Sequence, residues 1–400
     1  MDLSKDSSRS ALLDAIRRAK RIARIDLAQL TDISPATVTT VTADMIRQGL
    51  IEEVIPEELT SQSRRGRPRV NLKLRADAFL VAGLKVAETT ISVVLVNFVG
   101  EVVAQHTYHR TETRPAPEIL ITQIQQAIDA TLADVDYVFE DLSAVGLGIA
   151  GIVDAKRGFV HWSPFLNTRN LELAGMLKEA VNLPIFLDND ANLVAMAEQY
   201  LGNAQNTGNF IVVTIESGVG MGIVIDNKVY RGTRGCGAEF GHTKVQLDGA
   251  LCRCGQRGCL EAYVADYALL REASFDTSLF KEGGAERSIQ DLLTAARKGD
   301  PTAKSIIDRS SRIFAMGLSN LINLFDPELI ILSGERMSFD HLYAEEVIEV
   351  IRSSIVQVDA PPPDIIVHKW GDFMWERGAA AFALVGVAEM SLRDGLDRVA

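Results

Sequence analysis

The sequence predicts an α/β protein with a small helical head and a larger body that is internally duplicated. Residues 1–75 indicate the head, because three short helical patterns are followed there by two strands. Two series, residues 79–201 and 209–388, indicate the body, because in each of them three β-rich runs precede helices and further strands. This repeated order implies two α/β lobes, and a cleft between lobes is a common place for a small ligand.

Length and composition fit a protein of two or three globular domains. The chain has 400 residues, more than one ordinary domain, and its 47% hydrophobic residues can fill sizeable cores. No run approaches the roughly 18 apolar residues that span a bilayer, and the first ten residues have no signal-peptide pattern. Because the cysteines form no paired framework, we expect a cytoplasmic protein.

Charge is distributed unevenly between the head and the body. Residues 1–75 contain 14 Lys and Arg against 10 Asp and Glu, a balance of +4. Since the whole chain carries −12, the remainder carries −12 minus 4, or −16. A basic head on an acidic body is the asymmetry expected when only the head touches phosphate.

The head has the element order of a winged helix. Helices are expected over residues 10–20 and 25–30, and a third begins after Ser34, which precedes Pro35 at the first helical position. Gly49 ends this helix, and strands over residues 51–54 and 70–74 then form a hairpin. The segment between these strands is rich in arginine: Arg64-Arg65-Gly66-Arg67-Pro68-Arg69.

The third helix is predicted to read DNA bases. One face carries the apolar residues Val38, Val41, Met45 and Ile46. The other face is small and polar enough for a major groove, and the hairpin tip suits phosphate or the minor groove. The predicted DNA-binding residues are Ser34, Ala36, Thr37, Thr39, Thr40, Arg64, Arg65, Arg67 and Arg69. A protein-docking module with a solvated arginine loop is the alternative.

A short loop in the second series has the composition of a metal site. Within residues 241–261 it holds one histidine and three cysteines, His242, Cys252, Cys254 and Cys259. Zinc favours four such ligands in a tetrahedron, and turn glycines allow a loop to aim them at one point. Four protein ligands leave no position for a catalytic water, so we predict a structural zinc. Cys236 stands apart and is expected to be a packed residue or free thiol.

The elements of the body are expected in two matching sets. The first has strands over residues 79–86, 90–96, 101–108, 143–149 and 184–187, a helix over 117–132, and a helix that opens within residues 188–192 and runs through residue 201. The second has strands over residues 209–215, 220–225, 228–230, 328–332 and 364–367, with helices over 288–298, 301–325 and 376–388. The predicted domains are residues 1–75, a first lobe over 78–195 completed by a helix in 376–400, and a second lobe over 196–375.

Carboxylates and an amide are placed to converge on the expected cleft. Asp190 ends a strand, where it can accept a hydrogen bond or a proton from a hydroxyl. Such groups suit a neutral polyhydroxylated ligand, and the candidates are Asn189, Asp190, Glu239, His242 and Glu261. Ordinary surface acids and a helix N-cap are the alternative.

At these residues the chain resembles the ROK family of repressors, open reading frames and kinases, in particular its sugar-responsive regulators. The resemblance covers essentially the whole chain and is carried by short motifs. These are Gly66-Arg67-Pro68 in the wing, Gly146-Leu147-Gly148-Ile149-Ala150-Gly151, Asn189-Asp190, Arg231-Gly232, Glu239-Phe240-Gly241-His242 and Cys252-x-Cys254-Gly-x-x-Gly-Cys259-x-Glu261. It implies an actin-like, ribonuclease H-like duplicated sugar-kinase body behind a winged helix-turn-helix head.

The resemblance also implies roles for single residues. Asp190 matches the position of the base that takes a proton from the sugar hydroxyl in the kinases. Asn189, Glu239, His242 and Glu261 match positions that contact sugar hydroxyls. His242 can serve both sites if one ring nitrogen binds the metal while the other faces the sugar.

Departures from the family pattern fall on the phosphate loops. Lys85 stands where the first loop has Asp, and Glu88 replaces a glycine. Glu216-Ser217-Gly218 replaces Gly-Thr-Gly, and Ser333-Gly334-Glu335 stands at the later nucleotide-side glycines. Two like charges about 4 Å apart cost about 4 kcal/mol at an effective dielectric near 20. We therefore expect that ATP is not bound productively, that no residue is catalytic, and that Asp190 accepts hydrogen bonds from a sugar.

These expectations describe a regulator of carbohydrate-utilisation genes, expected to be a repressor. Its partners would be a double-stranded operator, a monosaccharide effector and a second copy in a homodimer or homotetramer, because paired half-sites multiply specificity. One alternative is an active ATP-dependent sugar kinase that kept a DNA-binding head. The other is a regulator whose input is a partner protein.

Overall fold

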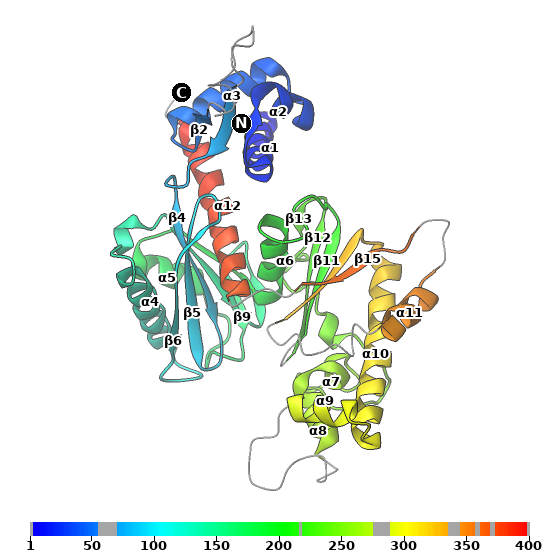
Figure 1. Ribbon diagram of the computed structural model, residues 1–400. Coiled ribbons are helices and arrows are strands. Elements are labelled where there is room, and N and C mark those ends of the chain that lie inside the picture. The colour runs from blue at the N-terminus through cyan, green and yellow to red at the C-terminus, as the bar shows by residue number, and fades with distance from the viewer. Residues whose placement is uncertain are drawn as a thin grey trace. The chain divides into compact units, whose positions relative to one another are not determined.

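The computed structural model of the chain describes residues 3–54, 70–215, 218–274, 289–334, 345–356, 361–368 and 373–397. It forms two compact units, shown as a ribbon in Figure 1. The first contains Met1–Asp190 and Trp375–Ala400, and the second contains Ala191–Met374. Among the described residues, no helix combines the length and the apolar character needed to cross a bilayer.

The head is a helix-turn-helix with a small sheet. Its elements are α1 (Leu3–Ala19), β1 (Ile22–Ala23), α2 (Arg24–Thr31), α3 (Pro35–Arg47), β2 (Ile51–Val54) and β3 (Asn71–Leu74). The strand β3 pairs antiparallel with both β2 and β1. The two-residue strand β1 was not predicted, because two residues are too few for a periodic pattern. The arginines Arg64, Arg65, Arg67 and Arg69, with Gly66 and Pro68, lie outside the described residues.

The first helix begins earlier than predicted, at Leu3 and not near residue 10. Residues 4–10 are polar and carry no apolar periodicity, so a contact such as that of Arg9 could not be inferred from the sequence. Arg9 supplies one such contact, because its guanidinium donates to the carbonyl oxygen of Leu392 at 2.9 Å and to Asp44 Oδ2 at 2.5 Å. Arg9 therefore joins α1, α3 and α12 (Met374–Asp397).

We predict that the Arg9–Asp44 pair stabilises the head. Both side chains are only 12% exposed, so Asp44→Asn leaves a mostly buried guanidinium without its charge partner. Such a loss costs about 3 kcal/mol, and thermal denaturation of the full chain should show it. Arg47→Gln is the matched control: Arg47 also pairs with Asp44, at 2.7 Å, but its side chain is 70% exposed. A surface pair of this kind contributes about 0–1 kcal/mol, so equal losses in the two variants would contradict the prediction.

The first α/β unit is built on a mixed sheet with the strand order β10-β7-β4-β5-β6. The strands β4, β5 and β6 are an antiparallel meander, β7 pairs in parallel with β4, and β10 pairs in parallel with β7. Their bounds are β4 (Leu80–Val86), β5 (Thr90–Asn97), β6 (Val102–His109), β7 (Ala144–Ile149) and β10 (Ile185–Asn189). The helices α4 (Pro117–Ala133) and α5 (Leu173–Val181), the turn η2 (Phe139–Asp141) and the hairpin β8 (Ile152–Asp154) and β9 (Phe159–Trp162) complete this part.

The two faces of this sheet are covered by different helices. Alternate residues of β4 and β7, such as Leu84 and Leu147, lie in one apolar cluster with α4 and α5. The intervening glycines, Gly83 and Gly146, face α12, where a Cβ would collide with backbone atoms of that helix. The helix α12 thus docks against the sheet through main chain, as its position beside the strands in Figure 1 shows.

The second unit repeats the strand order of the first. Its sheet runs β13-β12-β11-β14-β15, with β11, β12 and β13 antiparallel and β14 and β15 parallel to β11. The strands are β11 (Phe210–Ile215), β12 (Val219–Ile225), β13 (Lys228–Val229), β14 (Leu329–Ser333) and β15 (Asp364–Val367). The helices are α6 (Asp190–Tyr200), α7 (Glu261–Val264), α8 (Asp266–Ala273), α9 (Ile289–Arg297), α10 (Pro301–Phe325) and α11 (Glu345–Ser354), with the turn η3 (Phe240–His242). The duplicated α/β architecture predicted from the sequence is confirmed.

Candidate functional site

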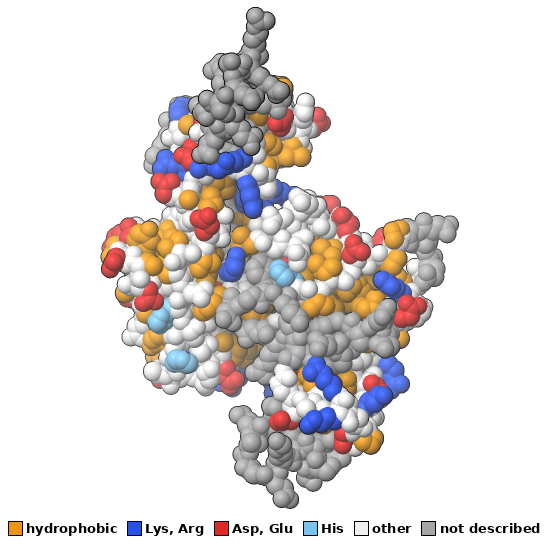
Figure 2. Space-filling view, viewed as in Figure 1, with side chains coloured by type: hydrophobic (Ala, Val, Ile, Leu, Met, Phe, Trp, Pro, Cys, Tyr) orange, Lys and Arg blue, Asp and Glu red, His pale blue; other side chains and the backbone are white. Residues whose placement is uncertain are grey.

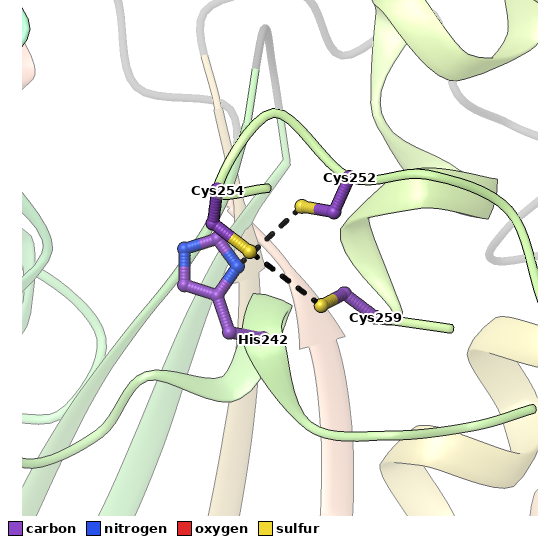
Figure 3. A group of neighbouring side chains, drawn as sticks. All are labelled: His242, Cys252, Cys254 and Cys259. Carbon is purple, nitrogen blue, oxygen red and sulfur yellow. Dashed lines mark hydrogen bonds between the residues drawn. The ribbon is translucent and has the colours of Figure 1, made fainter. Parts of the chain in front are cut away.

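The predicted metal ligands come together in the second unit, where His242, Cys252, Cys254 and Cys259 point toward one another (Figure 3). His242 ends η3, and the cysteines lie on the loop before α7. Two glycines of that loop have positive φ, Gly255 at 87° and Gly258 at 75°. At Gly258 a Cβ would also collide with the carbonyl oxygen of Gln246, so this turn requires glycine.

The donor atoms of the cluster are close enough to hold one metal ion. The four donor atoms all lie within 4.8 Å of one another. The Cys252 Sγ is 3.7 Å from His242 Nδ1, and the Sγ atoms of Cys254 and Cys259 are 3.8 Å apart. Zinc–sulfur bonds of about 2.3 Å in a tetrahedron place neighbouring sulfurs about 3.8 Å apart. The four residues could therefore hold a metal ion, and thiolate sulfurs with an imidazole nitrogen are the donors that zinc favours.

Groups around the cluster suit an anionic metal centre. Three thiolates and a neutral imidazole on Zn²⁺ leave a net charge of −1, and Lys244 Nζ lies 2.9 Å from Cys259 Sγ. This hydrogen bond raises the pKa of Lys244, whose ammonium group therefore stays charged. Burial raises the pKa of the Cys252 thiol, so a bound cation would be needed to favour its thiolate. Nothing in the sequence pattern distinguished Lys244 from other lysines.

Glu261 is tied to the same cluster. It is buried at the start of α7, and its Oε1 is 3.5 Å from Cys252 Sγ and 3.3 Å from the Tyr267 hydroxyl. Burial raises the pKa of Tyr267, which therefore remains a donor. The Glu261 Oε2 accepts from Val219 N at 3.3 Å. The sequence did not indicate Tyr267, because it lies six residues beyond Glu261 on α8.

The other predicted ligand residues occupy two places. Glu239 is exposed and immediately precedes η3, close in sequence to His242, whose Nδ1 faces Cys252. Asn189 and Asp190 belong to the first unit, at the end of β10 and the start of α6. The Asn189 side-chain amide donates to the carbonyl oxygen of Gly151 at 2.8 Å. The structure thus groups His242 and Glu261 around the metal loop and fixes Asn189 against the segment after β7.

Asn189 lies on the carboxyl edge of the first sheet. The register pairs Asn189 with Ile149, and Ile149 with Val86, so the parallel strands β10, β7 and β4 end in one row. In open α/β sheets this edge is where ligands bind. The turn that contains Glu88 follows β4 at this edge, and Glu88 is exposed there.

Some of the residues that depart from the phosphate loops of the kinases lie within the described part of the chain. The Lys85 ammonium lies 3.3 Å from the ring centroid of Trp375, a cation–π contact with the first turn of α12. Gly218 is retained, and a Cβ there would lie 3.1 Å from Glu261 Oε2. Ser333 is buried and its hydroxyl lies 3.1 Å from the Met374 sulfur. Glu216, Ser217 and Glu335 lie outside the described residues.

The helix α3 has the two faces that were predicted. Val38 and Met45 are fully buried, and Val41 and Ile46 pack partly buried against the same core. Ser34 caps the helix, because its hydroxyl accepts from Thr37 N at 3.2 Å. On the other face Ala36, Thr39 and Thr40 are exposed and Thr37 is half-buried.

The hydroxyls of α3 are already used within the helix. Thr39 Oγ1 donates to the carbonyl oxygen of Pro35 at 2.8 Å, and Thr40 Oγ1 donates to that of Ala36 at 3.1 Å. These side chains therefore offer methyl groups and acceptor lone pairs rather than donors. On the face in Figure 2 the head displays several Lys and Arg side chains among acidic ones.

A helix-turn-helix head on two α/β units of one strand order defines a class, the regulators built on the actin-like sugar-kinase fold. The sequence model of the ROK family matches residues 81–385. This chain belongs to the ROK family.

Similar proteins include regulators and a kinase. The xylose repressor of Caldicellulosiruptor bescii is 30% identical, covering 89% of this chain and 90% of its own length. The DNA-binding transcriptional dual regulator NagC of Escherichia coli K12 is 29% identical over 84% of this chain and 82% of its own. A solved ROK family transcriptional regulator, a homologue of the E. coli MLC protein, matches with a TM-score of 0.80 and 26% identity, covering 98% and 97% of the two chains.

The kinase branch is also represented. A ROK family glucokinase from Streptomyces griseus, solved with glucose and AMPPNP, matches with a TM-score of 0.64 and 30% identity. The match covers 76% of this chain and 99% of the kinase. The regulator matches thus cover 84% to 98% of this chain, whereas the kinase match covers 76% of it.

Proposed function

We propose that this protein is a DNA-binding transcriptional regulator, a repressor of carbohydrate-utilisation genes, whose kinase-like body binds a monosaccharide or a derivative of one. The observation that carries this proposal is the attachment of a helix-turn-helix head to the sugar-kinase fold. The repressors among the similar proteins, whose names refer to xylose and N-acetylglucosamine, support it. The protein would act in the cytoplasm as a homodimer or homotetramer.

The proposed division of labour follows the predicted domains. Residues 1–75 would bind the operator, residues 78–195 with 376–400 would form the first lobe, and residues 196–375 the second. The DNA contacts are assigned to Ser34, Ala36, Thr37, Thr39 and Thr40, and to Arg64, Arg65, Arg67 and Arg69. The sugar contacts are assigned to Asn189, Asp190, Glu239, His242 and Glu261. Structural zinc is assigned to His242, Cys252, Cys254 and Cys259.

Zinc in this proposal has no catalytic role. Nδ1 of His242 faces the sulfur cluster, so its other ring nitrogen remains for a sugar hydroxyl. Cys252 is close to both His242 and Glu261. Metal binding would therefore fix the orientation of two proposed sugar ligands at once.

We predict that the protein does not phosphorylate sugars. Lys85 carries a positive charge where the kinases have Asp, and its ammonium is held against Trp375. Glu88 adds an exposed carboxylate to the turn where phosphate would lie. In an assay with ATP, magnesium and a panel of hexoses and pentoses, phosphoryl transfer should not exceed the protein-free rate. Turnover that depends on Asp190 would instead support the active kinase.

The proposal is tested by measuring operator binding with and without sugars. The full chain is titrated, at fixed salt, against DNA from upstream of its own and neighbouring genes, with D-xylose, D-glucose, N-acetylglucosamine and their phosphates. One sugar should change the affinity of the wild type about tenfold or more, a typical allosteric coupling. Asp190→Asn should bind the operator equally well but lose most of the sugar response.

Each other outcome has a distinct meaning. Specific DNA binding that no sugar changes would favour a protein input. No specific DNA binding at all would contradict the assignment of the head.

A further inference from the structure

Arg110 makes an unusual set of contacts at the carboxyl edge of the first sheet. It directly follows β6, and its half-buried guanidinium donates to the carbonyl oxygens of Ala87 at 2.5 Å and Glu88 at 3.4 Å. It also donates to the carbonyl oxygen of Phe165 at 3.4 Å and to Gln123 Oε1 at 3.4 Å. One side chain thereby joins the turn after β4, the loop after β9 and the helix α4.

All these acceptors are neutral. Within the described residues, every partner of the Arg110 guanidinium is a carbonyl or amide oxygen, and burial lowers the pKa of the group. Burying a cation without a counter-charge costs free energy. The guanidinium has a geometric advantage that offsets this cost. It is planar and rigid, so it directs several N–H donors at fixed angles toward several acceptors at once. A lysine has one nitrogen and cannot reach both loops from the same place.

The loop that Arg110 holds is packed directly against the support of Asn189. Asn189 donates to the carbonyl oxygen of Gly151. Gly151 has a φ of 126°, and a Cβ there would collide with the carbonyl oxygen of Trp162 and lie 2.9 Å from Ser163 Cα. The Phe165 backbone nitrogen donates to Ser163 Oγ at 3.2 Å. A continuous set of contacts therefore runs from Arg110 through residues 162–165 and Gly151 to the Asn189 amide.

We propose that Arg110 is a positioning residue of the effector site, which ties the turn at residues 87–89 to the loop at residues 163–166 and so fixes the Asn189 side chain for a sugar hydroxyl. This inference rests on the proposed sugar-binding function and deepens it. Arg110 does not touch the effector itself. Its contribution is preorganisation: with the two loops already fixed, less ordering free energy is lost when the sugar binds.

Arg110→Gln tests the proposal in the full-length protein. The probe is whichever of D-xylose, D-glucose, N-acetylglucosamine or their 6-phosphates or 5-phosphates binds the wild type in calorimetry. The shorter glutamine side chain cannot hold both loops, so the dissociation constant of that sugar should rise about tenfold or more, as expected for loss of charge-assisted hydrogen bonds. Operator affinity without sugar should change less than about threefold. Arg110→Lys should recover only part of the sugar affinity, since one ammonium serves one loop.

Arg114→Gln is the matched control. Arg114 donates to the carbonyl oxygen of Pro164 at 2.8 Å, so it holds the same loop, but it does not reach the turn after β4. Its loss should change the sugar dissociation constant less than about threefold. Melting temperatures of all variants are measured, because a merely structural role would lower sugar affinity only together with stability.

The outcomes separate this inference from the proposed function. If the wild type binds a sugar and Arg110→Gln binds it equally well, the positioning role is wrong and the proposed function stands. An equal loss in Arg110→Gln and Arg114→Gln would also overturn it, because tethering of one loop would then suffice. If the wild type binds none of the sugars, the proposed sugar binding is contradicted, and the positioning role that rests on it is contradicted as well.

Discussion

Cys259→Ser is expected to abolish metal binding and to unfold the loop that carries His242 and Glu261. Purified wild-type protein should contain one zinc per chain by elemental analysis, and the variant should contain almost none. Structural zinc sites contribute on the order of 10 kcal/mol of folding free energy. Losing even half of this folding free energy should lower the melting temperature of the second unit by about 10 °C or more. Sugar binding should be lost with the metal.

Cys236, the cysteine outside the cluster, supplies the control for this variant. Cys236 is half-buried, and its sulfur lies 3.3 Å from the carbonyl oxygen of Arg234, away from the cluster. Cys236→Ser should therefore retain zinc, stability and sugar affinity. A Cys259→Ser protein that keeps stoichiometric zinc would show that the four residues are not the ligand set.

Thr40→Glu is expected to reduce specific operator binding by at least about a hundredfold. Thr40 is exposed in the middle of α3, on the face opposite the buried Val38 and Met45. A carboxylate there would be brought toward the phosphates, and a like charge about 4 Å away costs about 4 kcal/mol at an effective dielectric near 20. Fluorescence anisotropy with a labelled operator measures the loss. Sugar affinity should not change, since residue 40 lies in the head.

Thr40→Val separates the effect of charge from that of shape. Valine keeps the branched side chain, and the hydroxyl that it removes already donates to the carbonyl oxygen of Ala36. We therefore expect its operator affinity to remain within about threefold of the wild type. If Thr40→Glu binds operator as tightly as Thr40→Val, α3 does not enter a groove.

Elements with strong local patterns could be predicted closely from the sequence. The helix α10 begins at Pro301, after an Asp300 side chain that accepts from Ala303 N, and ends at Phe325 as expected. The Ser34–Pro35 start of α3 is equally local. The order of elements along the chain could also be predicted, because in each series three β-rich runs precede helices and further strands. These features depend on neighbouring residues, which the sequence displays directly.

Elements that depend on distant contacts could not be predicted. The helices α5, α7, α8 and α11 are short, and their sequences were not recognised as helical. The row that aligns Val86, Ile149 and Asn189 depends on register between strands far apart in the chain. Arg110 was missed for the same reason, since its acceptors are backbone carbonyl oxygens and no residue type marks a carbonyl. The His–Cys cluster could be predicted, because its four residues lie within one loop and cysteine and histidine are residue types typical of metal sites.

The position of α12 has a consequence for the time course of biosynthesis. Leu392 and Ala388 of α12 share one apolar core with Leu12 and Ile16 of the head. The same helix packs against Gly83 and Gly146 of the first sheet. At about 5 to 20 residues per second, the ribosome adds Leu392 on the order of 20 to 80 s after Leu12. Throughout that interval the core of the head lacks part of its apolar covering. A nascent chain would thus acquire a fully packed DNA-binding head only after both sugar-kinase-like sheets had been synthesised.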